Sequence, residues 1–101
     1  MKKLDDSQLH LVNGTSFHDV TIRTSINELT KLLGEPSMED NSGEDKVNVE
    51  WEVITNGTVG TIYDWKEYRR LGGDDVVEFH IGGHTKLDTT IIFRELFNLV
   101  K

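Results

Sequence analysis

The chain has 101 residues and no cysteine, with 36% hydrophobic and 29% charged residues. A chain of this size is expected to form a single globular domain, residues 1–101, with a core that needs no metal or disulfide. The absence of cysteine excludes disulfides and thiolate chemistry. The net charge of −7 argues against binding nucleic acid through its phosphates.

The negative charge is concentrated in one segment. Residues 35–52 hold seven acids and one base, which leaves the other 83 residues with a net charge of only −1. Residues 35–45 are rich in turn formers and show no apolar periodicity, so we expect a mobile acidic loop there.

The N-terminal residues predict neither a signal peptide nor a membrane anchor. Residues 1–7 are polar and are expected to be disordered, and the longest apolar runs in the chain are three residues. These features favour a cytoplasmic protein that makes no contact with a membrane.

The first half of the chain predicts two strands and a helix. Residues 9–13 and 17–22 alternate as short strands around Asn13-Gly14. Ser25 and Glu28 have the spacing of an N-terminal helix cap, and Gly34 and Pro36 end the pattern, so a helix is expected over residues 25–33.

Residues 46–66 predict a hairpin. Every odd position from 47 to 53 is apolar, and Asn56-Gly57 is the preferred pair for a two-residue turn. That turn sets Trp51 opposite Ile62 on the core face. Asp64 falls on the same face, where a buried carboxylate needs a hydrogen-bonding partner.

A strand over residues 76–81 and a helix over residues 86–100 complete the pattern. The predicted fold class is therefore α+β, an antiparallel sheet of four to five strands packed by two helices in the order β-β-α-β-β-β-α. The last helix is apolar enough to suggest a homodimer, formed either through this helix or through the outer face of the hairpin. The helix residues expected in that contact are Ile92, Phe93, Leu96, Phe97 and Val100.

Four segments, residues 29–36, 46–51, 61–69 and 79–83, followed by the expected last helix, together resemble a group of small uncharacterised bacteriophage proteins that share an I-Y-D-W-K … [WF]-H-I-G-G pattern. This chain has Phe79 at the position where that group carries Trp. The resemblance implies a phage accessory protein that acts against host defence, either by sequestering a nucleotide signal or by blocking a defence protein.

The favoured candidate site is an anion pocket. A Gly-Gly pair leads into the last helix, whose free amides favour a phosphate, and basic and aromatic residues lie nearby in the sequence. The predicted function is a non-enzymatic binding protein for an anionic, nucleotide-like small molecule. The predicted site residues are Lys66, Arg69, Arg70, Gly82, Gly83, His84, Tyr63 and Trp65.

Enzymatic and metal sites are not expected. Asp64 and His80 fall on opposite faces of the predicted sheet, which is unsuited to acid–base catalysis. His80 and His84 flank the glycines and do not share a helix face, so neither a metal nor a cofactor is predicted. The alternative function is a protein-binding inhibitor that uses the acidic residues 35–52 to block a basic surface of a host protein.

Overall fold

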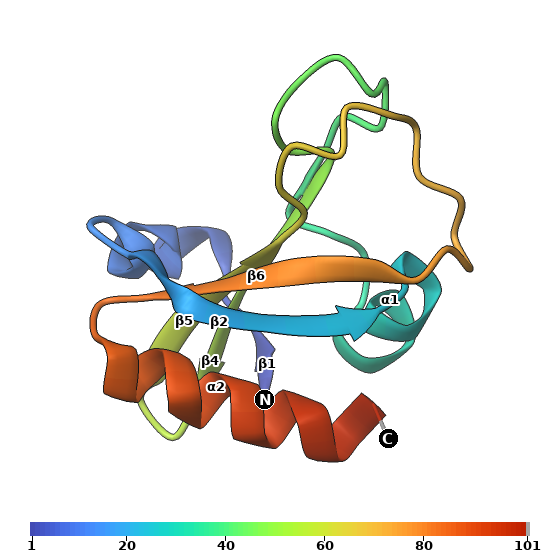
Figure 1. The fold of residues 1–101 in the computed structure, drawn as a ribbon. Coiled ribbons are helices and arrows are strands. Elements are labelled where there is room, and N and C mark those ends of the chain that lie inside the picture. Colours follow the sequence, from blue (N-terminus) through green and yellow to red (C-terminus); the bar gives the residue numbers. More distant parts are fainter. Residues whose placement is uncertain (101) are drawn as a thin grey trace.

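The structure is a computed structural model that describes residues 1–100. It is an α+β fold, as predicted, in which one antiparallel sheet has helices packed against it (Figure 1). The sheet order is β1-β4-β5-β6-β2, and a short β3 pairs with another part of β4. The elements are β1 (Lys2–Lys3), a 3₁₀ helix η1 (Asp6–Val12), β2 (Ser16–Thr24), α1 (Ile26–Leu33), β3 (Met38–Glu39), β4 (Val49–Thr55), β5 (Thr58–Tyr63), β6 (Val77–Gly83) and α2 (Lys86–Val100).

The predicted strand at residues 9–13 is wrong, because most of this segment belongs to η1. Its backbone hydrogen bonds are made locally, as in the 2.8 Å bond from the Gln8 N–H to the Asp5 carbonyl. The Gln8 side chain in turn accepts from the Asp5 N–H at 3.0 Å. A polar segment satisfied in this way needs no neighbouring strand.

Two segments expected to be irregular take part in the sheet. Within residues 1–7, for which the sequence predicts disorder, β1 pairs with Val53 and Ile54 of β4. Within the acidic loop, β3 pairs with Val49 and Glu50 of the same strand.

The β4–β5 hairpin has the register that its turn predicts. Trp51 pairs with Ile62, and Asn56 and Gly57 both take positive φ angles, 48° and 81°. Trp51 and Ile62 are fully buried, and the Trp51 indole N–H donates to the Gly34 carbonyl at 2.9 Å. The core therefore lies on the Trp51 face of the sheet, against which α2 packs.

Both helices begin where the sequence predicts. The Ser25 hydroxyl accepts from the Glu28 N–H at 3.2 Å, and the Thr85 hydroxyl accepts from the Asp88 N–H at 3.0 Å. Leu29 of α1 and Ile92 of α2 are fully buried in the same core. Within residues 1–100, no helix is long and apolar enough to cross a membrane.

Candidate functional site

A polar hollow lies on the outer face of the sheet, the face opposite the core. Its floor comes from β4, β5 and β6, one wall comes from the end of η1 and the turn after it, and the segments flanking the hairpin close one end. The hollow has a volume of about 330 Å³. Its lining residues are Val12, Thr15, Ser16, Val47, Glu50, Thr61, Tyr63, Trp65 and Gly82. We call it the outer-face hollow.

Strand register sets the floor of this hollow. Glu50 pairs directly with Tyr63 across β4 and β5, and Thr61 pairs with Gly82 across β5 and β6. Directly opposite residues of antiparallel strands point to the same face. The alternation that buries Trp51 on the core side therefore puts Glu50 and its neighbours on the outer side.

A pair of carboxyl groups lies at the β4 side of the floor. Burial, together with the hydrogen bond and negative charge of Glu52, raises the pKa of Glu50 from 4.5 to about 8. Glu52 is only 9% exposed, and no hydrogen-bond partner lies within reach of its Oε2 atom among residues 1–100. Near neutral pH Glu50 therefore favours its protonated form.

Next to this pair of carboxyl groups, the outer face of the sheet carries a cluster of aromatic rings. Tyr63 and Trp65 meet edge to face with ring centroids 6.2 Å apart, and His80 lies 5.6 Å from Tyr63. Phe17 stacks on His80 at 4.0 Å. Burial lowers the pKa of His80, against the raising effect of nearby carboxylates, so the imidazole favours its neutral form.

Two ammonium groups flank the exposed ring of Trp65. Lys46 Nζ lies 5.9 Å and Lys66 Nζ 5.7 Å from the ring centroid, and Trp65 itself is 38% exposed. These distances are within the range of cation–π attraction. The outer-face hollow thus has the Glu50 carboxyl group on its floor and positive charge beside the aromatic ring at one end.

Gly82 leaves space above the floor. A Cβ atom at this position would lie 2.4 Å from Thr61 Oγ1 and 3.6 Å from Tyr63 Cε1. No side chain fits there without displacing Thr61. Gly82, which the sequence places in a predicted phosphate-binding turn, is a floor residue of the outer-face hollow.

The predicted site residues therefore divide into two groups. Tyr63, Trp65 and Gly82 line the outer-face hollow, and Lys66 lies beside it at Trp65. The other predicted residues do not join them.

Gly83 and His84 lie at the far end of β6 from the loop of residues 67–75, which carries Arg69 and Arg70 (Figure 1). The seven residues of β6 separate these groups by about 20 Å at about 3.3 Å per residue. Gly83 packs against α2, where a Cβ atom would lie 2.6 Å from Thr89 Oγ1. His84 Nε2 is 2.7 Å from the Leu11 carbonyl oxygen. The Gly-Gly turn and the two arginines thus do not form one pocket.

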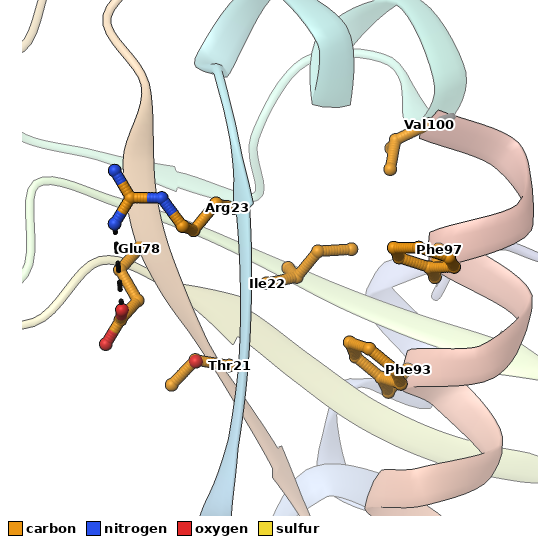
Figure 2. Close-up of a pocket in the computed structure, with 7 residues that line it drawn as sticks. All are labelled: Thr21, Ile22, Arg23, Glu78, Phe93, Phe97 and Val100. Atoms are coloured by element: carbon orange, nitrogen blue, oxygen red, sulfur yellow. Dashed lines mark ion pairs between the residues drawn. The ribbon is translucent and has the colours of Figure 1, made fainter.

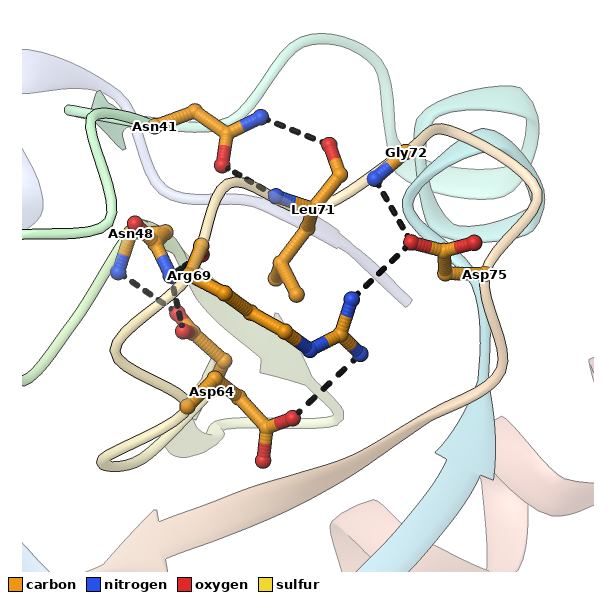
Figure 3. A network of polar contacts seen from close by, with 8 residues as sticks. Asn41, Asn48, Asp64, Arg69, Leu71, Gly72 and Asp75 are labelled. Carbon is orange, nitrogen blue, oxygen red and sulfur yellow. Dashed lines mark hydrogen bonds and ion pairs between the residues drawn. The ribbon is translucent and has the colours of Figure 1, made fainter.

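Arg69 has structural partners within its own loop (Figure 3). Its guanidinium lies 3.1 Å from Asp75 Oδ2 and 3.5 Å from Glu67 Oε1. The Gly72 N–H and this guanidinium lower the pKa of Asp75, which keeps the carboxylate ionised. Arg70 is exposed on the same loop.

The acidic loop is braced against the 67–75 loop (Figure 3). The Asn41 side chain donates to the Leu71 carbonyl at 2.8 Å and accepts from the Leu71 N–H at 2.7 Å. A Cβ atom at Gly43 would lie 2.7 Å from the Arg69 backbone. The acidic residues 35–52 are also not one continuous surface, because Glu52 is buried and Glu50 faces the outer-face hollow.

A second, apolar groove of about 470 Å³ lies along β2, which is an edge strand of the sheet. Figure 2 shows Ile22 pointing toward Phe93, Phe97 and Val100 of α2, whereas Thr21, Arg23 and Glu78 lie on the other side of the strand. Of the five helix residues expected at a dimer contact, Ile92 and Leu96 are fully buried in the core, and Phe97 is 47% exposed.

Metal ligands do not gather within residues 1–100, where no group of three or more His, Asp or Glu side chains is placed to hold an ion. Asp64 is fully buried and is occupied by hydrogen bonds from the β4 segment. It does not face His80.

Three residues beside or on the floor of the outer-face hollow are not among the predicted site residues: Glu50, Glu52 and Lys46. The predicted hairpin register already placed Glu50 beside Tyr63, and the two acids, two positions apart on one strand, share a face. No known protein family, curated protein or solved structure matches the chain.

Proposed function

We propose that the chain is a non-enzymatic binding protein that takes an anionic, nucleotide-like small molecule into the outer-face hollow. The observation that carries the proposal is Trp65, an exposed aromatic ring at the end of the hollow with the ammonium groups of Lys46 and Lys66 within 6 Å of its centroid. The base of a nucleotide bound in the hollow has an aromatic face to stack on, and the phosphate of the nucleotide has the two lysine ammonium groups within reach.

The energetics favour a ligand that has both an aromatic base and a phosphate. Stacking of a base on an aromatic side chain contributes about 1–3 kcal/mol, and a lysine ammonium binds phosphate as a point charge. A hollow of about 330 Å³ is near the lower end of small-molecule sites, which suits a mononucleotide or one nucleotide unit of a larger ligand. The proton held by Glu50 reduces the repulsion that the carboxyl pair exerts on an anion.

On this proposal, the chain acts in the cytoplasm of a bacterial host as a phage accessory protein that sequesters a nucleotide signal. The resemblance to small phage proteins motivates this role. The alternative is an inhibitor that presents the acidic segment to a basic host surface. It receives less support because Glu52 is buried and Glu50 faces the outer-face hollow.

The test is a titration of the purified protein with GMP, AMP and CMP, followed by the fluorescence of Trp65. Trp51, the other tryptophan, is fully buried and serves as a constant background. We expect saturable quenching by at least one nucleotide. The variant Lys46→Ala/Lys66→Ala should weaken binding about tenfold or more and reduce its dependence on salt concentration.

The matched control is Lys31→Ala, which removes one exposed lysine from α1. It should bind like the wild type. No saturable binding of any nucleotide would contradict the proposed function, as would equal binding by the double lysine variant.

We also propose that two copies associate through the groove beside β2, with Phe93, Phe97 and Val100 packing against the same residues of the partner. The exposure of Phe97 next to an unpaired sheet edge supports this arrangement. Sedimentation equilibrium should give a dimer for the wild type and a monomer for Phe97→Asp. Leu87→Asp, which changes another exposed residue of α2, should leave the dimer intact; a monomeric wild type would contradict this arrangement.

A further inference from the structure

We infer that the Glu50–Glu52 pair selects the base of the bound nucleotide, and that Glu50 accepts hydrogen bonds from the two adjacent N–H donors of a guanine edge. This inference rests on the proposed function and adds the identity of the base to it. It concerns the floor of the outer-face hollow, whereas the proposed function rests on Trp65 and its two lysines.

Glu50 lies beside the rings on which a base would stack. It lies directly opposite Tyr63 on the floor, so its carboxyl group is beside the aromatic wall on which a base would stack. Thr61, which also lines the hollow, pairs with Glu52 one step along the hairpin. A base that stacks on one of these rings can turn its hydrogen-bonding edge toward Glu50 on β4.

Glu52, the neighbour of Glu50 on the same face of β4, carries an unsatisfied acceptor. Glu52 is nine-tenths buried, and its Oε2 atom has no hydrogen-bond partner in the part of the chain that the structure describes. Buried acceptors without donors are rare and unfavourable in folded proteins. A proton on Glu50 can satisfy this atom in the free protein, and a ligand that donates to both Glu50 oxygens displaces that proton.

The bases differ in the hydrogen-bonding groups that they would present to Glu50. Guanine carries N1–H and the exocyclic N2 amino group side by side, which matches the two acceptor oxygens of one carboxylate. Adenine has a ring nitrogen acceptor beside its amino group, so an ionised Glu50 would face a lone pair there. Charge-assisted hydrogen bonds of this bidentate kind are stronger than neutral ones.

Proton release should accompany guanine binding. In the free protein Glu50 keeps its proton at neutral pH, because of burial and because of Glu52 on the same strand. The other titratable groups around it are Tyr63 on β5, His80 on β6 behind Tyr63, and Lys46 and Lys66 beside Trp65. Two N–H donors aimed at Glu50 favour its ionised form, so the bound complex holds fewer protons than the free partners.

The experiment is calorimetric titration of the wild type with GMP, IMP and AMP in Tris and in HEPES at pH 7. IMP retains the ring N–H of GMP and lacks the exocyclic amino group. We expect GMP to bind about tenfold or more tightly than AMP, with IMP between them, since each lost donor leaves an acceptor unpaired. The apparent enthalpy for GMP should differ between the two buffers, which reports the released proton.

The variant Glu50→Gln should lose the preference for GMP and its buffer dependence, while it retains AMP binding. The control Glu39→Gln, which neutralises an exposed acid in β3, should behave like the wild type. Equal affinity for GMP and AMP in the wild type would overturn base selection and leave the proposed function intact. Absence of binding by all three nucleotides would overturn both, and the comparison of bases in the wild type decides the question even if Glu50→Gln does not fold.

Discussion

The Asp64 carboxylate accepts hydrogen bonds from both the backbone N–H and the side-chain amide of Asn48, at 2.7 Å and 2.8 Å (Figure 3). A third bond comes from the Val49 N–H at 3.0 Å. Asn48 and Asp64 are both fully buried, and they join the start of β4 to the segment after β5. Their chain neighbours Val47 and Trp65 line the outer-face hollow, so this contact positions one end of the candidate site.

Replacing Asp64 with asparagine should destabilise the fold. One carboxylate oxygen becomes an amide donor that faces other donors, and the charge that strengthens the remaining bonds is lost. We expect a decrease of about 2–3 kcal/mol in the free energy of unfolding, measured by urea denaturation.

The comparison for this variant is Asp45→Asn, which removes an exposed acid from the same region. It should change stability by less than about 0.5 kcal/mol, as most surface substitutions do. Equal stability of Asp64→Asn and the wild type would show that the buried contact with Asn48 contributes little.

A second prediction concerns Gly82. Gly82→Ala should lower stability by about 1–3 kcal/mol, because its Cβ atom would lie 2.4 Å from Thr61 Oγ1. Thermal unfolding of the single variants and of the double variant Gly82→Ala/Thr61→Ala measures this effect.

The double variant should recover most of the stability lost in Gly82→Ala. Once Thr61 Oγ1 is removed, the nearest remaining atoms, the Ser16 carbonyl oxygen and Tyr63 Cε1, are at 3.5 Å and 3.6 Å, which is ordinary contact. If the double variant lost as much stability as the two single variants combined, this would contradict the contact with Thr61 Oγ1 as the origin of the strain.

A third prediction concerns the dependence of stability on pH. Below pH 4.5 Glu50 is protonated in both the folded and the unfolded chain. Between its ordinary pKa of 4.5 and its folded pKa of about 8, the folded chain holds a proton that the unfolded chain has released. The contribution of Glu50 to stability is therefore complete at low pH and is lost as the pH rises through this window.

Glu50→Gln removes this loss, because glutamine stays neutral at every pH. The carboxyl group of Glu50 is partly solvated, which screens its penalty, so we expect the variant to exceed the wild type by about 1–2 kcal/mol at pH 9. Near pH 4.5 the two should be similar. Denaturation curves measured across this range would contradict the prediction if the difference between the two proteins did not change with pH.

The fold was largely predictable because its strongest local patterns agree with its packing. The Asn56-Gly57 turn and the alternation through Trp51 determine the β4–β5 register, and Ser25 and Gly34 determine the limits of α1. η1 was mistaken for a strand because apolar alternation over a few residues does not reveal whether a neighbouring strand is present. The short β1 and β3 depend on the edge of β4, which local sequence does not specify.

The candidate site was only partly predictable, because its residues meet through sheet register and not through motif spacing. Gly82 and His84 are close in sequence to a helix start and suggested a phosphate site, yet Gly82 faces the floor of the outer-face hollow while His84 contacts Leu11. Glu50 was counted only as part of an acidic segment. Its role depends on how deeply Glu52 is buried, and that is determined by tertiary packing.

The most direct test of the central claim is the titration of the wild-type protein with nucleotides, followed by Trp65 fluorescence. We expect saturable quenching, with the tightest binding for GMP and binding about tenfold or more weaker in Lys46→Ala/Lys66→Ala. Fluorescence that remains unchanged at saturating concentrations of GMP, AMP and CMP would contradict it.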